Sequence, residues 1–197
     1  MNQKRAELTV MSRLDLTRRL VARLDDDAAV VAGIGNTNFD LFAAGHRPAN
    51  FYMLGSMGLA VPIALGVALA QPERTVIALE GDGSILMNLG TLTTVAARAP
   101  VNLTVIVWDN GLYQITGRQA TATASVTDIV AVAAGCGIAG SNWAADESGF
   151  ESLVDEALGS HGPHFIAARV DAEPGAARPE RNPVLLRDRF MKGIGTA

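Results

Sequence analysis

A repeated alternation of short apolar runs with helix-like segments constrains the fold more than any other feature of the sequence. Apolar runs that read as buried strands lie at 28–35, 75–80, 103–108, 137–143 and 164–172. The segments between them predict helices, at 12–24, 38–45, 55–71, 85–99, 127–136 and 148–160. Strands that are apolar throughout are typical of a parallel sheet with helices on both faces. The sequence therefore predicts an α/β fold with a doubly wound, mostly parallel sheet.

Composition narrows the class of protein. The 197 residues are 49% hydrophobic and only 18% charged, which indicates that part of the surface is covered by another subunit. A net charge of −4 argues against nucleic acid as a partner, and the single Cys136 excludes disulfides or a cysteine zinc cluster within the chain. The longest apolar stretch, Met57–Ala70, is too short for a membrane span. We expect a soluble cytoplasmic protein with one domain over 1–197, whose segment 173–197, rich in proline and arginine, is an extended tail or arm.

Polar residues gather where the predicted strands end, which is where open α/β sheets bind ligands. One strand ends in Gly81-Asp82-Gly83-Ser84, and the next is followed by Asn110. If these two strands are neighbours, Asp82 and Asn110 lie close together. A carboxylate and an amide oxygen form a partial magnesium shell that substrate phosphates complete, and glycine amides receive phosphate oxygens. Each stretch taken alone is more often an ordinary turn, but the two together predict a metal-bridged diphosphate.

At these positions the sequence resembles thiamine-diphosphate enzymes, which carry GDG followed at this distance by a pair of amide or acid residues. Here the motif reads GDGS at 81–84, and the usual Asn-Asn pair is replaced by Asp109-Asn110. The stretches FYMLGSMGLAVPIALGVALA and VWDNGLYQITGRQAT are similar to the diphosphate-binding half of sulfopyruvate and phosphonopyruvate decarboxylases. Ile115 stands where these relatives commonly have a small polar residue.

The resemblance implies thiamine diphosphate and Mg²⁺ as cofactors, and a role for each matching residue. Metal ligands would be Asp82, Asn110 and the carbonyl of Leu112. Met57 would wedge between the two rings of the cofactor, and the carbonyl of Gly55 would accept from its 4′-amino group. The whole set expected at the cofactor is Asn36, Thr37, Gly55, Ser56, Met57, Gly81, Asp82, Gly83, Ser84, Asn110, Leu112 and Tyr113. No residue is assigned as catalytic with certainty, and the candidates at the mouth of the site are Thr116, Arg118 and Gln119.

The family also needs a glutamate at the pyrimidine ring, supplied by a separate pyrimidine-binding domain for which this chain leaves no room. The resemblance therefore implies a subunit of a split decarboxylase of small anionic 2-oxoacids. Its partner would be a pyrimidine-domain α subunit, in a heterotetramer or a larger oligomer. Glu80 is expected to face a helix end or a subunit contact rather than to replace that glutamate. Arg118 is either a contact for an anionic substrate group or a solvated surface residue.

Three other functions compete with this interpretation. A nicotinamide dehydrogenase is suggested by GIGNTN at 33–38, but Asn38 replaces the last glycine of that fingerprint and the acid expected about 20 residues later is absent. A carboligase of the acetolactate-synthase type uses the same cofactor. A non-catalytic module of the same fold is the third alternative, which Asp109 and Ile115 keep open.

Overall fold

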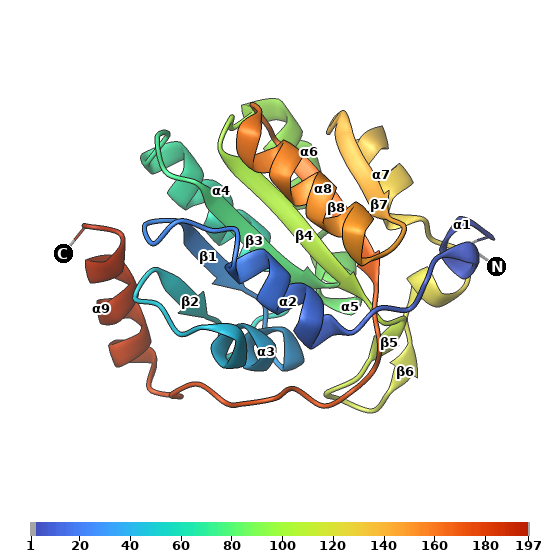
Figure 1. The fold of residues 1–197 in the computed structure, drawn as a ribbon, viewed down its shortest axis with the longest axis horizontal. Helices are drawn as coiled ribbons and strands as arrows, with labels where there is room; N and C mark the ends of the chain where they lie inside the picture. Colours follow the sequence, from blue (N-terminus) through green and yellow to red (C-terminus); the bar gives the residue numbers. More distant parts are fainter. Residues whose placement is uncertain (1–2, 197) are drawn as a thin grey trace.

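The computed structural model describes residues 3–196, whose centre is a six-stranded sheet with the strand order β2-β1-β3-β4-β8-β7 (Figure 1). Every pair of neighbouring strands in this sheet is parallel. The strands are β1 (Ala29–Ala32), β2 (Asn50–Tyr52), β3 (Val76–Gly81), β4 (Leu103–Asp109), β7 (Gly140–Ala144) and β8 (His164–Arg169). The predicted fold class is confirmed. β2 and β3, the next two strands along the chain, lie on opposite sides of β1. A crevice therefore opens at the carboxyl ends of β1 and β3.

Helices cover both faces of the sheet, with α2, α3 and α8 in front and α4, α6 and α7 behind (Figure 1). The front helices are α2 (Arg13–Val21), α3 (Asn36–Ala44) and α8 (Glu147–Gly159). Those behind are α4 (Ala60–Ala70), α6 (Gly90–Arg98) and α7 (Ile129–Gly135). Within the described part of the chain, none of the helices combines the length and the apolar character that a bilayer crossing requires.

The helix predicted over 85–99 is interrupted. A short helix α5 (Asp82–Ile85) follows β3 directly, and a 3₁₀ turn η1 (Leu86–Asn88) separates it from α6. The helical turn therefore begins at Asp82, three residues earlier than expected, and an acid in a first turn is favoured by the helix dipole. The sequence reasoning also missed β2, the helix α1 (Gln3–Glu7), the 3₁₀ turn η2 (Ala122–Ala124) and a small antiparallel hairpin, β5 (Leu112–Tyr113) with β6 (Gln119–Ala120).

The C-terminal segment is only partly the extended tail that the sequence predicts. Residues 171–182, which we name the strap, are extended and run beneath α3 (Figure 1). The chain then forms a helix, α9 (Pro183–Gly193), so the prediction of an extended arm is wrong for this part. Asn182 caps the helix, Pro183 suits its first position, and Leu186 and Phe190, one turn apart, are buried against the edge of the sheet.

A buried ion pair joins α2, α3 and the strap. Arg13 Nε lies 2.7 Å from Asp40 Oδ2, and the two side chains are 3% and 1% exposed. Arg13 Nη2 donates to the carbonyl of Glu173 at 2.7 Å, and the other Asp40 oxygen accepts from the amide of Ala176 at 2.9 Å. Each charge is thus compensated inside the protein, so the loss of one partner leaves the other buried and unpaired.

We predict that Arg13→Ala lowers the free energy of unfolding by about 3–5 kcal/mol, because it strands the Asp40 carboxylate. Urea unfolding followed by circular dichroism measures the change. The matched control is Arg19→Ala on the same helix, whose ion pair with Asp15 is exposed and whose removal should have a far smaller effect. Equal effects of the two variants would contradict the role given to Arg13.

Candidate functional site

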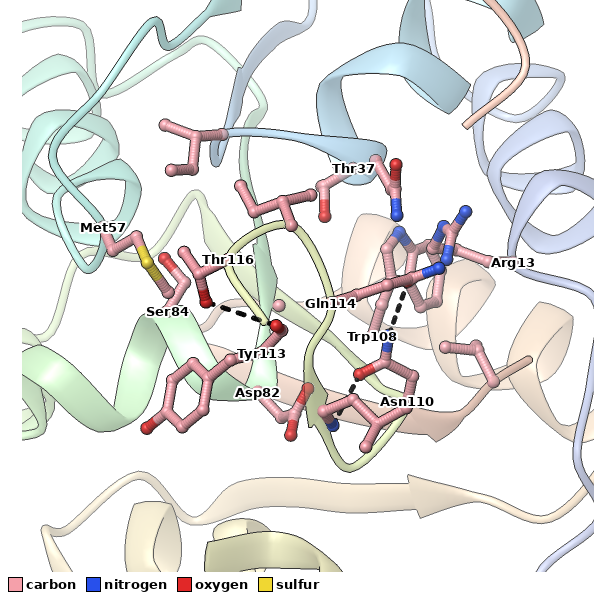
Figure 2. A pocket seen from close by; sticks show the side chains of 17 residues that line it. Arg13, Thr37, Met57, Asp82, Ser84, Trp108, Asn110, Tyr113, Gln114 and Thr116 are labelled. Carbon is pink, nitrogen blue, oxygen red and sulfur yellow. Dashed lines mark hydrogen bonds between the residues drawn. The ribbon is translucent and has the colours of Figure 1, made fainter. Parts of the chain in front are cut away.

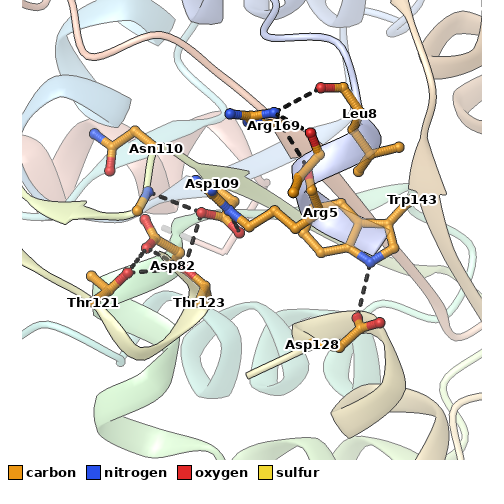
Figure 3. A network of polar contacts seen from close by, with 12 residues as sticks. Arg5, Leu8, Asp82, Asp109, Asn110, Thr121, Thr123, Asp128, Trp143 and Arg169 are labelled. Carbon is orange, nitrogen blue, oxygen red and sulfur yellow. Dashed lines mark hydrogen bonds and ion pairs between the residues drawn. The ribbon is translucent and has the colours of Figure 1, made fainter. Parts of the chain in front are cut away.

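A pocket opens at the carboxyl ends of β1, β3 and β4, and most of the expected cofactor residues line it. The register of β3 and β4 pairs Gly81 with Trp108, so the residues that follow these strands leave the sheet side by side. Asp82 and Asn110 both line the pocket and lie next to each other in two views (Figures 2 and 3). The expectation that the two residues meet agrees with this geometry.

Asp82 is 2% exposed and is held by two threonines that follow β6. Its Oδ2 accepts from Thr121 Oγ1 at 2.6 Å and lies 2.9 Å from Thr123 Oγ1. Thr123 Oγ1 also lies 3.0 Å from Asp109 Oδ1, which places a second carboxylate beside the first (Figure 3). Burial, and then the negative charge of Asp109, raises the pKa of Asp82 to about 6. A cation bound at Asp82 would offset both effects.

Asp109 serves the structure of the site rather than lining the pocket. Its Oδ2 forms an ion pair of 2.9 Å with Arg5 Nε from α1, and its Oδ1 accepts from the amide of Gly111 at 2.9 Å (Figure 3). Gly111 has a φ of +73°, which glycine adopts without strain. The departure from the usual Asn-Asn pair therefore has a physical account, because Arg5 balances the additional charge. Sequence reasoning had no signal for Arg5, which lies 104 residues away.

Asn110 is oriented by its own loop. Its Oδ1 accepts from the amide of Leu112 at 2.9 Å, and its Nδ2 donates to Gln114 Oε1 at 2.9 Å (Figure 2). Gln114 in turn donates to the carbonyl of Ala172 in the strap. Asp82, Asn110 and the carbonyl of Leu112 offer hard oxygen ligands, which suit Mg²⁺. Within residues 3–196 no group of three or more His, Cys, Asp or Glu side chains could hold a metal. One carboxylate, one amide oxygen and one backbone carbonyl form a partial shell, of the kind that phosphate and water complete around Mg²⁺.

The turn that carries Met57 is fixed to the GDGS segment by three side chains. The Gly58 amide donates to Ser84 Oγ at 2.8 Å, and Asn88 Nδ2 donates to the Gly58 carbonyl at 3.0 Å. Gly58 has a φ of +81°, and a Cβ there would lie 2.9 Å from the Cβ of Asn88, so only glycine fits. Glu80 Oε1 accepts from the amide of Ala60, the first residue of α4, at 3.0 Å. Met57 therefore lines the pocket in a position that Ser84, Asn88 and Glu80 determine.

Glu80 is fully buried and faces the start of α4, in agreement with the expected contact with a helix end. Burial raises its pKa to about 7, against hydrogen bonds from Ser84 and two backbone amides that lower it. Its Oε2 has no hydrogen-bond partner among the described residues. A Cβ on Gly33 would lie 2.4 Å from that oxygen, so a glycine in β1's outgoing loop makes room for the carboxyl group.

The expected site residues divide into those that line the pocket and those that do not. Those that line the pocket are Asn36, Thr37, Met57, Gly81, Asp82, Gly83, Ser84, Asn110, Leu112, Tyr113 and Thr116. Gly55, Ser56, Arg118 and Gln119 are exposed and are not among its lining residues. Residues that sequence reasoning did not place there are Arg13, Ile34, Trp108, Gln114, Ile115 and Val170. Trp108 packs against Phe150, as expected for a core residue, yet its buried Nε1 has no partner within the described chain.

Comparison with known proteins agrees with the geometry. Residues 33–168 match the model of the family described as thiamine pyrophosphate enzyme, C-terminal TPP binding domain. The chain belongs to this family. The match begins directly after β1, includes α3, and contains both strand ends that carry Asp82 and Asn110. The resemblance predicted from GDGS and Asp109-Asn110 is confirmed.

The relatives include both whole enzymes and separate subunits. The chain is 39% identical over 187 residues to a phosphonopyruvate decarboxylase of Streptomyces viridochromogenes, with 94% of this chain and 47% of the relative covered. It thus spans about half the length of that protein. It is 43% identical over 168 residues to the sulfopyruvate decarboxylase subunit beta of Methanothermobacter thermautotrophicus, with 85% of each chain covered.

Among solved structures, a thiamine diphosphate-dependent 4-hydroxybenzoylformate decarboxylase of Rhodococcus jostii RHA1 superposes with a TM-score of 0.71 at 26% identity, covering 81% of this chain and 32% of that one. The fold of this chain is therefore one already known among thiamine diphosphate-dependent enzymes.

We predict that Glu80→Gln stabilises the cofactor-free chain above pH 7. Because the folded-state pKa of Glu80 is raised, its contribution to stability is complete below about pH 4.5 and is lost as the pH rises through about 7. Glutamine keeps the acceptor for the Ala60 amide without the charge. The free energy of unfolding of the variant, relative to that of wild type, should therefore rise by about 3 kcal/mol when the pH is raised from 5 to 8. Thermal and urea unfolding at the two pH values measure this gain. Glu156→Gln, at an exposed position on α8, is the control, and a pH-independent difference would refute the prediction.

Proposed function

We propose that this chain is the diphosphate- and Mg²⁺-binding subunit of a thiamine-diphosphate-dependent 2-oxoacid decarboxylase. The observation that carries the proposal is the placement of Asp82 and Asn110 in one pocket at neighbouring strand ends, with the carbonyl-bearing Leu112 beside them. Sulfopyruvate and phosphonopyruvate decarboxylases at 38–43% identity support an anionic 2-oxoacid as the substrate, whereas the acetolactate synthase isozyme 1 large subunit of Escherichia coli is 28% identical.

The residues of this chain would perform three tasks. Asp82, Asn110 and Leu112 would hold the metal, and the amides of Gly83 and Ser84 at the start of α5 would receive phosphate oxygens. Met57, on its clamped turn, would support the rings. When bound, the cofactor supplies the electron sink into which the bond to the departing carboxylate releases its electrons.

A pyrimidine-binding domain on a partner subunit would complete the enzyme. The relatives named as subunit beta support this arrangement, since their matches with this chain extend over 85–98% of their own length. In such a complex the cofactor would lie between the two chains, with its diphosphate on this one. The glutamate that the family needs at the pyrimidine would come from the partner.

We predict that thiamine diphosphate binds the complex with its partner only when Mg²⁺ is present, and that Asp82→Ala abolishes this uptake. Removal of the carboxylate takes away the charged ligand, while the neutral Asn110 and Leu112 oxygens alone hold the ion weakly. Isothermal titration calorimetry with and without EDTA measures the binding. Asp188→Ala, which removes an exposed carboxylate from α9, is the control and should bind as wild type does. Metal-independent binding, or full binding by Asp82→Ala, would disprove the proposed site.

The division of labour between subunits has its own test. The purified chain alone, with Mg²⁺ and thiamine diphosphate, should not decarboxylate sulfopyruvate or phosphonopyruvate, and activity should appear when a pyrimidine-domain chain is added. Release of carbon dioxide in a coupled assay gives the rate. Robust turnover by the chain alone would contradict the split arrangement and leave the metal site unaffected.

A further inference from the structure

A second pocket adjoins the first and shares Ile34, Asn36 and Ile115 with it. Its other walls are Asn38 and Phe39 of α3, the loop at Met53 and Leu54, and the strap residues Arg178, Pro179 and Arg181. The strap, which carries these arginines, comes from the far end of the sequence and runs beneath α3 (Figure 1). A pocket next to the expected place of the cofactor is thus lined by two cationic side chains.

The strap is fixed in place before it reaches the arginines. The amide of Gly175 donates to Asn36 Oδ1 at 3.1 Å, and Gly175 lies so close to Phe39 that a Cβ would come within 2.5 Å of the Cβ of Phe39. Arg13 and Asp40 hold the neighbouring strap residues, as described above. Pro179 is buried. The guanidinium carbon of Arg178 lies 5.4 Å from the centre of the Phe39 ring, a cation–π distance that orients this side chain.

The two arginines that line this pocket are not held in ion pairs with described residues. In the described part of the chain no ion pair includes Arg178 or Arg181, and the lining residues contain no acid. The nearby Glu180 accepts from the amides of Arg181 and Asn182 at 2.8 and 3.0 Å with one carboxylate oxygen, Oε1, and forms no ion pair with Arg178 or Arg181 among the described residues. Both arginines are exposed, so their guanidinium groups are accessible to a ligand that enters the pocket, and two cations without an ion pair in the described chain at one pocket favour an anionic ligand.

A buried polar atom in the wall also points to a ligand. Asn38 is 2% exposed and lines this pocket, and its Oδ1 has no hydrogen-bond partner among residues 3–196. Its Nδ2 donates to the carbonyl of Met53, which fixes the orientation of the amide. Native proteins rarely leave a buried acceptor unpaired, and such an atom in a pocket wall is characteristic of a functional site.

We propose that Arg178 and Arg181 bind the anionic group at the end of the substrate remote from the reacting carbons. This inference rests on the proposed decarboxylase function. A guanidinium pair at the departing carboxylate would oppose the reaction, because decarboxylation removes the charge that the pair stabilises. A sulfonate, phosphonate or carboxylate at the other end keeps its charge throughout, so arginines there bind the substrate without raising the barrier. Arg118, the arginine that the sequence suggests for this task, lines neither pocket.

Binding of an unreactive substrate analogue tests the assignment. The probe is 3-sulfopropionate, which keeps both anionic ends but lacks the 2-oxo group, and butyrate is the matched compound without the distal anion. Calorimetry is performed on the complex of the full chain with its partner, loaded with Mg²⁺ and thiamine diphosphate. We expect Arg178→Met and Arg181→Met each to weaken 3-sulfopropionate binding by about tenfold, the loss of one charge-assisted contact, and to leave butyrate binding unchanged. Arg187→Met, an exposed arginine of α9 that lines neither pocket, is the control.

Kinetics and assembly give two independent readouts. The two variants should raise the KM for the anionic 2-oxoacid and leave kcat near that of wild type. The assignment is overturned if 3-sulfopropionate affinity is unchanged in the variants, or if butyrate affinity falls equally. It is also overturned if the variants lose the partner subunit in size-exclusion chromatography, because the arginines would then be interface residues. Failure of the proposed function is distinguishable, since the wild-type complex would then take up no cofactor with Mg²⁺, whatever the arginine variants do.

Discussion

The parallel pairing of β3 with β4 is the constraint on which the site depends. Because Gly81 and Trp108 are partners in the sheet, the two loops that leave these strands start at the same level of the same edge. Asp82 and Asp109 are therefore forced together, and the fold must manage two adjacent carboxylates in a buried place. Arg5 neutralises one of them and two threonine hydroxyls contact the other, which leaves the remaining charge of Asp82 for a cation.

The buried acids of the site make the folded chain less stable than uncharged side chains at the same positions would. Glu80 and Asp82 are both buried, and their pKa values are raised to about 7 and about 6. Raised values mean that the charged forms are disfavoured in the folded chain. Glu80 nevertheless holds the first amide of α4, and thereby the turn of Met57. The chain thus loses stability at neutral pH while the residues that line the pocket are held in fixed positions, a pattern common at functional sites.

Local patterns in the sequence were sufficient for the sheet and for the centre of the site. Every residue of β3 and β4 except Gly81 is buried, and the apolar runs of these strands identify them in the sequence. The residues that follow them are contiguous with a strand end, so topology places them. Arg5 and Arg13 could not be found in this way, because their partners lie 104 and 27 positions away and nothing local distinguishes them from surface arginines. The strand β2 has only three residues, too few for a periodic pattern.

Ile115 shows how a departure from the family pattern acquires a physical meaning in the folded chain. A Cβ on Gly35 would lie 2.9 Å from Ile115 Cδ1, so the hairpin tip rests directly on the glycine that precedes α3. Gly35 also has a φ of +79°, which a larger residue would adopt only with strain. The isoleucine thus closes against the first turn of α3 and forms part of the wall between the two pockets. The apolar side chain of Ile115 therefore offers no polar contact to either pocket.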